Sequence, residues 1–413
     1  MSDEDVELVE RTEKHRIKKG DKYYNMIMDF CHKSKNLYNQ ANYILRYHYI
    51  QGNGIVLYNY LDKVLKVNTD YPDYRNMPTA QSAQQTLRML CSNWKAFSNS
   101  LKSWGKNPEK FLGKPKMPKY LKKDSNYVLV LTNQNCKLKG DIIRFPKIFN
   151  GFEVKVKFTS RDNYESFQMI RFIPKETSIT VEVVYRIRIS TPKLRNKRVV
   201  SIDVGVNNLT TIVNNVNLPS ISISGRVPKS MNQFYNKEMS KLRSIAMTVN
   251  NRHSTKRMER LSEKRNRKIN DYMHKASRYI VNYCVENDIS GIIIGKNDNW
   301  KQKSKLGKVT NQHFVQMPFA RLIEMIQYKA EEVGIAVKLT EESYTSGTSF
   351  IDGERPVKEN YDKSRRVHRG LFKSNSGVLI NADVNGAYQI MNKVFKYKYT
   401  EKCSLHPRAV KIV

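Results

Sequence analysis

The sequence has 413 residues, and its 73 Lys and Arg against 38 Asp and Glu give a formal net charge of +35 at pH 7. With 39% hydrophobic and 10% aromatic residues, the chain can build two or three domain cores, which excludes a disordered polycation. No run of about 18 apolar residues occurs, so we expect no membrane span. The charge predicts a polyanionic partner, with nucleic acid favoured over an anionic membrane surface.

The five cysteines are scattered and never form a CxxC pair, which argues against a disulfide framework and a cysteine zinc site. The first ten residues, MSDEDVELVE, are acidic and lack the apolar region of a signal peptide. We therefore expect a reducing, cytoplasmic setting.

The N-terminal third is predicted to be mainly helical after a charged, weakly β-like segment over residues 1–22. Apolar residues at helical spacing predict one helix over about 24–49 and a second from Thr79, a favoured capping residue, to Gly105. The second helix should pack its aromatic stripe against the first. The Pro- and Lys-rich loop 113–124 is either a solvated linker or a basic loop that contacts phosphate.

Residues 127–188 change to a period of two, with β-branched residues in five short runs separated by turn residues. This pattern predicts a small antiparallel barrel or sandwich. Several strands carry Lys or Arg on alternate positions, so one face can be buried while the other meets an anion.

After the polar hinge 191–197, the sequence predicts two strands and then a third at 220–224, followed by a mainly helical segment. A strand over 290–295, a helix over 318–333, a strand over 335–340 and a final helix from about Asn385 are predicted after that. This order is that of an RNase H-like α/β domain. The two later strands, each preceded by a helix, should lie parallel and adjacent in the sheet.

A basic helical segment covers about residues 230–287. Between Lys237 and Arg278 it has 13 Lys and Arg against 4 Asp and Glu. It is either a solvated arm or, as we favour, a helix pair that lines a nucleic-acid channel. The residues expected to bind nucleic acid here are Arg252, Lys256, Arg257, Arg260, Lys264 and Arg265.

Two aspartates occupy positions suited to a metal site. Asp203 ends the apolar strand VVSID, and Asp383 starts the last helix. Each has a structural alternative, since Asp203 could cap a turn and Asp383 could cap the helix. Hydrolysis of a phosphodiester by two Mg²⁺ ions needs several converging carboxylates, so a third acid is required. Asn385 could support Asp383.

The segments around Asp203 and Asp383 resemble motifs of the TnpB (OrfB) family of transposon-encoded, RNA-guided DNA endonucleases, which is related to type V CRISPR effectors. VVSIDVGVNN and NADVNGAYQI resemble its first and third RuvC motifs. Further similar segments are SKNLYNQANYIL (34–45), HKASRYIV (274–281) and SYTSGTS (343–349). The resemblance covers essentially the whole chain.

The resemblance implies an α+β multidomain protein with a helical recognition lobe, a β-barrel wedge domain and an RNase H-like (RuvC) nuclease. The expected ranges are 1–22 and 123–192 for the wedge, 23–122 for the recognition domain and 193–413 for the nuclease, with the basic insertion at 230–287 and a cysteine-free, degenerate zinc-knuckle region at 344–380.

The resemblance further implies a guide RNA from the transposon end and a double-stranded target DNA with a short motif read by the protein. Mg²⁺ or Mn²⁺ would be the cofactor. We expect a protein of the prokaryotic cytoplasm, associated with the nucleoid, with no membrane partner, and we favour a monomer.

The sequence departs from the family at the second motif. A strand like 290–295 usually ends in Glu, whereas this chain has Gly295. Either the nuclease is inactive, leaving an RNA-guided DNA-binding repressor, or the acid has moved. The neighbouring strand ends in Glu341 and Glu342, and we favour Glu342, with Glu341 as the alternative and the loop residue Asp298 third. Adjacent strand residues face opposite ways, so both glutamates cannot be ligands.

The second departure concerns zinc. Relatives place two CxxC pairs before the last motif, but here Ser349 and Asp352 stand near the first pair and LFKSNSG (371–377) has no Cys. His368 alone cannot hold zinc, so none is expected. The loop 361–370 is basic instead, and Arg365 and Arg366 are predicted to contact nucleic acid.

Two aromatic residues remain ambiguous. Trp300 either stacks on a base or caps the core, and we favour the core. His274 is more suited to packing or phosphate binding than to general base catalysis. The leading hypothesis is thus a Mg²⁺-dependent, RNA-guided endonuclease with Asp203, Glu342 and Asp383 as catalytic residues and metal ligands. A guided repressor is the first rival. A cut-and-paste transposase, for which no helix-turn-helix module is evident, is the second.

Overall fold

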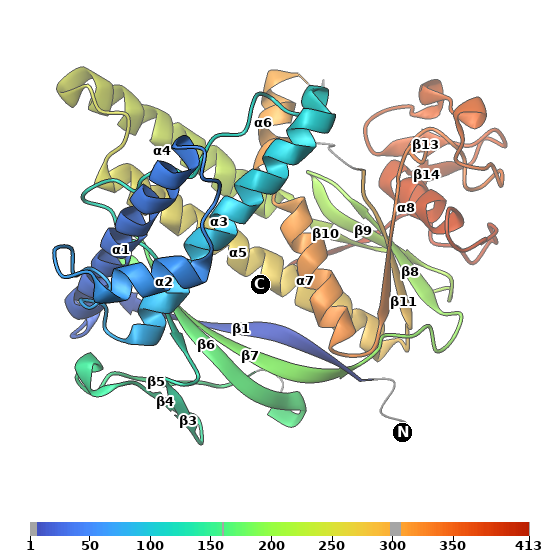
Figure 1. The fold of residues 1–413 in the computed structure, drawn as a ribbon. Helices are drawn as coiled ribbons and strands as arrows, with labels where there is room; N and C mark the ends of the chain where they lie inside the picture. Colours follow the sequence, from blue (N-terminus) through green and yellow to red (C-terminus); the bar gives the residue numbers. More distant parts are fainter. Residues whose placement is uncertain (1–5, 159–160, 298–306, 413) are drawn as a thin grey trace. The chain divides into compact units, whose positions relative to one another are not determined.

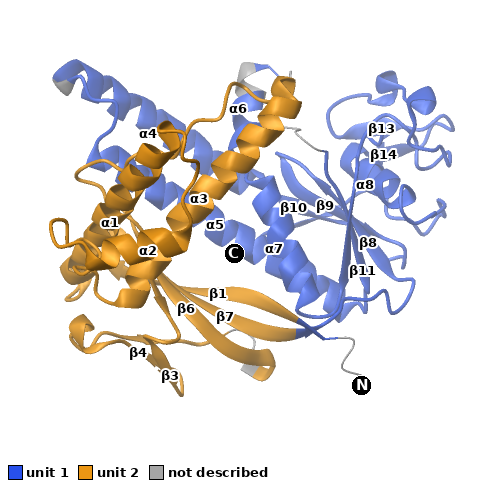
Figure 2. Ribbon diagram, in the orientation of Figure 1, with its two compact units in different colours: residues 1–7, 189–413 blue, residues 8–188 orange. Residues whose placement is uncertain are grey.

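The computed structural model describes residues 6–158, 161–297 and 307–412, and the chain divides into two compact units. One comprises residues 8–188 and the other residues 1–7 and 189–413 (Figure 2). No helix in these described ranges is long and apolar enough to cross a membrane.

Three helices form the helical part of the 8–188 unit: α1 (Tyr24–Ile50), α2 (Tyr58–Val67) and α3 (Ala80–Lys106). The two long helices confirm the sequence prediction, whereas α2 was not predicted. Thr79 caps α3 by accepting a hydrogen bond from the Ser82 amide at 3.1 Å. The aromatic stripe of α3 packs on α1, where Trp94 donates to the Asn42 side chain at 2.9 Å.

The strands of this unit form two open sheets, so the predicted closed barrel was wrong. One sheet has the order β1 (Val6–Lys18), β7 (Ser178–Ser190), β6 (Tyr164–Pro174) and β2 (Leu129–Thr132). The other consists of β3 (Lys137–Lys139), β4 (Ile142–Arg144) and β5 (Glu153–Lys155). Three-residue strands offer few ladder bonds with which to close a barrel. Helix α1 also packs on the short 3-10 helix Lys147–Phe149 that lies between β4 and β5 in the sequence, where Phe30 lies 5.0 Å from Phe149 between ring centroids.

The 189–413 unit is built on a six-stranded sheet of order β12, β11, β8, β9, β10, β15. The strands span Val199–Val204 (β8), Asn208–Asn214 (β9), Ile221–Ser224 (β10), Gly291–Gly295 (β11), Ala336–Thr340 (β12) and Arg408–Val410 (β15). Strands β11 and β12 are parallel neighbours, as predicted, with Gly295 paired to Thr340. Strand β15, parallel to β10, was not predicted.

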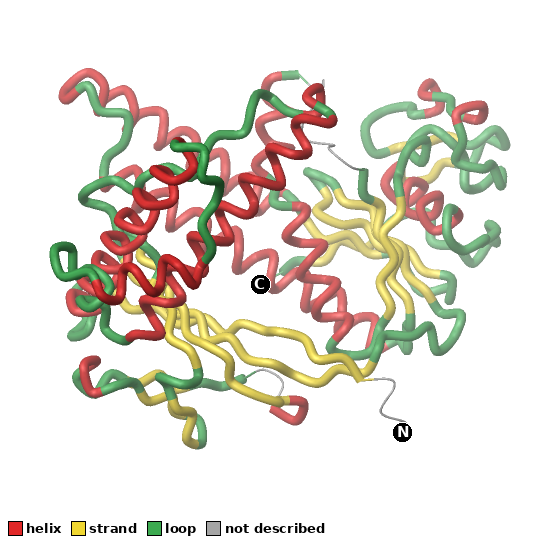
Figure 3. The backbone as a smooth tube through the Cα atoms, in the orientation of Figure 1, coloured by secondary structure: helices red, strands yellow, loops and turns green. Residues whose placement is uncertain are grey.

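Helices cover both faces of this sheet (Figures 1 and 3). One layer holds α5 (Lys256–Glu286) and α7 (Phe319–Glu331), and the other holds α8 (Ala382–Asn392). Alternate strand residues supply the two cores: Ile292 and Ile294 face the first layer, whereas Ile293 faces the second. Pro318 precedes α7 as expected.

Two further helices and a hairpin complete the unit. Helix α4 (Arg226–Asn250) packs along α5 through a small core of Met239, Ala246 and Met258, and α6 (Lys308–Gln316) precedes α7. The antiparallel pair β13 (Leu371–Lys373) and β14 (Leu379–Asn381) leads directly into α8. The sheet, the hairpin and α8 together position the acidic residues.

Candidate active site

Asp203 is the penultimate residue of the central strand β8. Its carboxylate contacts the backbone of α8 closely, because a Cβ added at Gly386 would lie 3.2 Å from Asp203 Oδ2. Burial raises the pKa of Asp203 well above its ordinary range, and the nearby Asp383 and Glu342 raise it further, while Arg366 opposes them. Arg366 therefore offsets only part of the cost of burying this carboxyl group beside two other acids.

Glu342 follows the end of β12 and reaches the space beside β11. A Cβ at Gly295 would lie 2.9 Å from Glu342 Oε2 and 2.6 Å from Ile390 Cδ1. The glutamate thus occupies the space that a side chain at position 295 would need. Asn297 holds it, donating to Oε1 at 3.2 Å and accepting from the Glu342 amide at 3.0 Å. Burial raises the pKa of Glu342 to about 7, and Glu341 adds to this while Lys393 lowers it.

Asp383 stands in the first turn of α8 but does not cap it. Asn381 is the capping residue, accepting from the Asp383 and Val384 amides at 3.0 and 3.1 Å, so the capping alternative for Asp383 was wrong. The Asp383 carboxylate instead accepts from Asn208 Nδ2 at 2.8 Å, and Arg366 lies 3.7 Å away. Near a helix N-terminus the negative charge is also favoured by the helix dipole.

Asn385 does not face this carboxylate. It is buried and bonds the 348–350 turn, accepting from the Phe350 amide at 3.0 Å and donating to the Thr348 carbonyl at 2.8 Å. Its role is to fix that turn on α8.

The structure brings Asp203, Glu342 and Asp383 to one cavity of about 580 Å³. The remaining lining residues are Asn297, Ser343, Tyr344, Thr345, Ser346, Tyr361, Arg366, Ala382 and Gly386. Glu341 does not line it. Its exposed carboxylate accepts from Lys393 Nζ at 2.9 Å, which agrees with the expectation that the two glutamates face opposite ways.

Three carboxylates at one cavity provide the hard oxygen donors that Mg²⁺ prefers. In residues 6–297 and 307–412, apart from 159–160, no three His, Cys, Asp or Glu side chains are arranged closely enough to hold an ion. Like-charged carboxylates repel each other, and here Asn208, Asn297 and Arg366 draw two of them toward other partners. The donor chemistry fits a divalent cation, which would have to draw the three groups together.

The two arginines of the basic loop have different environments. Arg366 is partly exposed and lines the acidic cavity. Arg365 is almost buried, with 11% of its side chain exposed, and bonds Glu354 at 2.8 and 2.9 Å as well as the Gly347 and Asn360 carbonyls, both at 2.9 Å. Only Arg366 is therefore placed to contact a polyanion at this cavity.

A polar cluster occupies the region where relatives carry cysteines. Asp352 accepts from the Asn375 and Ser376 amides at 2.7 and 3.3 Å, and Glu354 accepts from the Ser349 amide at 2.7 Å. Hydrogen bonds lower the pKa of Asp352, and the bond from Arg365 does most to lower that of Glu354, although burial opposes both shifts. We call Asp352, Glu354, Arg365 and Asn375 the polar clamp.

The basic helix α5 and the loop before it carry the other predicted contacts. Arg252, Lys256, Arg257, Arg260 and Lys264 are exposed. Arg265 differs, because its guanidinium bonds Asn232 at 2.7 Å and the Gln316 carbonyl at 3.1 Å. It therefore fastens α4 and α5 to the end of α6.

The other residues considered from the sequence are not at the cavity. His274 is exposed within α5, and its carbonyl accepts from Lys329 at 2.8 Å. His368 is exposed in the basic loop. Asp298 and Trp300 lie outside the described residues.

Sequence reasoning missed the two asparagines that hold the acids. Asn208 is the last residue of the first motif and the first of β9, and Asn297 follows β11 by two residues. A search for amide side chains at the ends of strands next to the acids could have found both.

Comparisons with known proteins point the same way. A family model described as "Probable transposase" matches residues 178–301, and one described as "Cas12f1-like, TNB domain" matches residues 319–390. A search of curated sequences found no match.

Among solved structures, the chain is similar to Cas12f1 in complex with sgRNA and target DNA, with 18% identity, a TM-score of 0.38 and coverage of 92% of this chain and 99% of that one. It is also similar to the mini-RNA-guided endonuclease CRISPR-Cas_phi3, with 10% identity, a TM-score of 0.44 and coverage of 98% and 93%. TM-scores below 0.5 do not by themselves establish a shared fold. Two separate segments of the chain thus match a transposase model and a Cas12f1-like model, in agreement with the motif resemblance to the TnpB family and its type V relatives.

Proposed function

We propose that this protein is a transposon-associated, RNA-guided DNA endonuclease that hydrolyses phosphodiester bonds with divalent metal ions. One observation carries the proposal: Asp203, Glu342 and Asp383, from three separate segments, line a single cavity. Three acids gathered beside one lining cation, Arg366, are costly in the free protein, and such a cost is expected where a metal cation and a phosphate are to be bound.

The sheet supports an RNase H-like (RuvC) nuclease domain. Strand β9 is antiparallel to both of its neighbours, β8 and β10. On the other side of β8, β11 is parallel to β8 and β12 is parallel to β11, and helices cover both faces of the sheet. Asp203 on the central strand is then flanked by Glu342 after the edge strand and by Asp383 on the covering helix α8.

Asp203, Glu342 and Asp383 would hold Mg²⁺ or Mn²⁺, which supplies activation of the attacking water and stabilises the leaving oxygen. Asn208 and Asn297 orient Asp383 and Glu342 through the hydrogen bonds given above. Arg366 can meet a phosphate oxygen at the same cavity and balance its negative charge.

Guide RNA from the transposon end and double-stranded target DNA are the proposed partners of a monomer. The formal charge of +35 and the exposed cations of α4 and α5 support two polyanionic ligands. The proposed place of action is the prokaryotic cytoplasm, at the nucleoid.

The test compares Asp203→Asn and Asp383→Asn with the parent protein, purified with its co-purifying RNA and assayed on a plasmid that the RNA matches. Both variants should lose cleavage in Mg²⁺ and keep the RNA. Glu341→Gln, outside the cavity, is the matched control and should cut like the parent.

Three outcomes would change the proposal. Undiminished cleavage by Asp203→Asn would remove the acids from catalysis. Guided binding by the parent without cleavage in any divalent metal would favour a repressor. Strand transfer without RNA would favour a transposase.

A further inference from the structure

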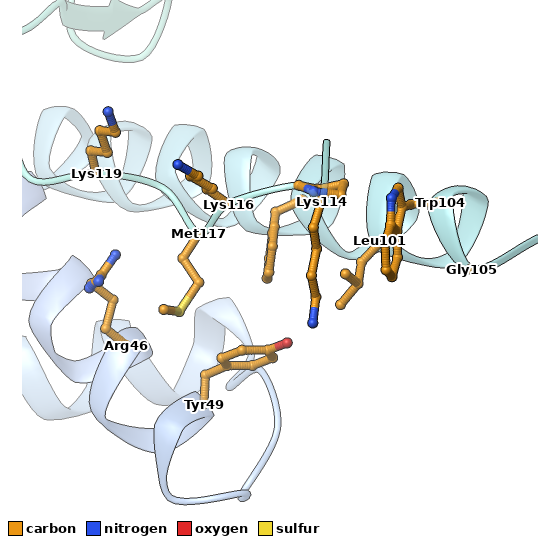
Figure 4. A pocket seen from close by; sticks show the side chains of 11 residues that line it. Arg46, Tyr49, Leu101, Trp104, Gly105, Lys114, Lys116, Met117 and Lys119 are labelled. Carbon is orange, nitrogen blue, oxygen red and sulfur yellow. The ribbon is translucent and has the colours of Figure 1, made fainter. Parts of the chain in front are cut away.

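The 8–188 unit contains a second cavity, of about 700 Å³, remote in sequence from the acids. Its walls are the C-terminal turns of α1 and α3 and the loop 114–119, as Figure 4 shows. The lining residues are Arg46, Tyr49, Phe97, Leu101, Trp104, Gly105, Lys114, Pro115, Lys116, Met117 and Lys119.

The loop that forms one wall is docked on α1 and is not a free linker. Arg46 and Asn42 donate to the Pro118 carbonyl at 2.9 and 3.2 Å, and Lys35 donates to the Lys123 carbonyl at 2.8 Å. The Arg46 guanidinium also lies 5.2 Å from the Tyr120 ring centroid. The cavity wall is thus fixed before any ligand arrives, which lowers the entropy that binding must overcome.

The chemistry of the cavity combines aromatic rings with cations. Tyr49 packs edge-on against Phe97, with 5.6 Å between the ring centroids. Trp104, which also lines the cavity, is partly exposed. Lys114 Nζ lies 5.6 Å from the Trp104 ring centroid. In Figure 4 the Lys114 and Met117 side chains point from the loop toward Tyr49, whereas Lys116 and Lys119 point the other way.

No acidic residue lines this cavity, and four of its lining residues are cations. Within the described part of the chain, Lys114, Lys116 and Lys119 form no ion pair. Lys114 points toward the rings, so an apolar ligand would leave its charge unmatched, and a simple anion would not use the rings. A nucleotide satisfies both, since its base has a π-face and its phosphates are anionic.

We propose that this cavity binds an unpaired nucleotide of the guide RNA, an inference that rests on the proposed function for the identity of the RNA. The base stacks on Trp104 in place of the Lys114 ammonium, and Lys114 moves to a flanking phosphate. Duplex target DNA offers no unpaired base, and its displaced strand is unpaired only after the guide has paired with the other strand, whereas a folded RNA offers unpaired bases from the start, the form that proteins recognise by stacking on aromatic side chains.

The experiment measures binding of the co-purifying RNA, and of single-stranded DNA of the same sequence, to RNA-stripped full-length protein in EDTA. Trp104→Ala should weaken RNA binding by roughly 5- to 100-fold, from the usual energy of base stacking. Trp104→Phe should stay within about threefold of the parent, because a phenyl ring still stacks. Lys114→Gln should weaken binding and flatten its salt dependence.

Lys102→Gln, an exposed cation on α3 outside the cavity, is the matched control and should change RNA binding no more than any single surface charge. Ultraviolet crosslinking of the parent should attach an RNA nucleotide to a peptide containing Trp104 or Tyr49. Unchanged RNA affinity in Trp104→Ala, or loss of DNA binding alone, would overturn the proposal. Since no step requires cleavage, a failed nuclease assay would leave this result intact, and the reverse also holds.

Discussion

The acidic cavity and the polar clamp, both in the 189–413 unit, use the same side chains in opposite ways. In the clamp, Asp352 and Glu354 accept several hydrogen bonds, and their pKa values are lowered. In the cavity, burial raises the pKa values of Asp203 and Glu342, and neighbouring acids raise them further: Asp383 and Glu342 for Asp203, and Glu341 for Glu342. The acids of the clamp have their donors within the chain, whereas at the cavity three acids share two asparagines and one lining cation, Arg366.

The difference separates acids that stabilise the fold from acids that we propose to be functional. A carboxylate with its donors supplied by the protein stabilises a loop, as Glu354 does through Arg365. A carboxylate that packs against a glycine, with few hydrogen-bond donors around it, lowers the stability of the free protein and gains a partner only when a ligand binds. The predictions below test whether the two sets respond to mutation as this contrast requires.

The largest effect is expected at Glu342. Glu342→Gln should reduce guided cleavage at least about 100-fold, because it removes a proposed metal ligand, while Glu341→Gln should stay within about fivefold, as for the loss of an exposed ion pair. Single-turnover cleavage on a linear target measures both. Equal activity of the two variants would show that neither glutamate completes the site.

Breaking the clamp should lower stability and leave metal binding alone. Arg365→Met leaves Glu354 without its cation, and we expect a loss of about 3–5 kcal/mol in the free energy of unfolding. The double variant Glu354→Gln/Arg365→Met should recover part of it, since no buried charge is then unpaired. Urea denaturation measures both. A loss below about 1 kcal/mol would make the clamp a surface feature.

A side chain at Gly295 should strain the acidic cavity. Gly295→Ala places a methyl group 2.6 Å from Ile390 Cδ1 and 2.9 Å from Glu342 Oε2. Overpacking of this kind costs about 1–3 kcal/mol. Gly113→Ala, where no atom lies within 4 Å, is the control and should be close to neutral in the same denaturation assay. A neutral Gly295→Ala would mean that Glu342 moves aside freely.

The smallest effect is a pH-dependent one. The folded-state pKa of Glu342 is about 7 against an ordinary 4.5. The folded state therefore keeps a proton that the unfolded state has lost, and stability falls as pH rises from about 4.5 to about 7. In EDTA at pH 8, Glu342→Gln should be more stable than the parent by about 2 kcal/mol, with little difference at pH 4.5.

Thermal unfolding at the two pH values measures the gap. Adding Mg²⁺ at pH 8 should stabilise the parent and leave Glu342→Gln nearly unchanged. Equal gaps at both pH values would contradict a raised pKa.

Regular spacing made much of the fold predictable. The parallel neighbours β11 and β12, the cap at Thr79 and the start of α7 all follow from local patterns. The barrel was wrong because period two identifies strands but not their closure. The alternative in which Asp383 caps α8 was wrong because Asn381, an equally good capping residue two positions earlier, is the cap.

The environment of the site was less accessible to sequence reasoning. Spacing and the resemblance suggested the three acids, and the structure puts them at one cavity, although their catalytic role stays a proposal. The burial of Arg365 was not predictable, since its partners Glu354 and Asn375 come from loops without periodicity. Charge alone could not distinguish it from Arg366.

The overlap between Gly295 and Glu342 makes the two positions interdependent in evolution. An acid at 295 and an acid at 342 would compete for the same volume, so a lineage that carries one must keep the other position small or turned away. The proposed site then requires a carboxylate at one position in the structure, and that carboxylate can come from either of two positions in the sequence. Under the proposed function, a survey that requires an acid at the end of β11 would score this chain as an inactive nuclease, because its acid follows the neighbouring strand β12.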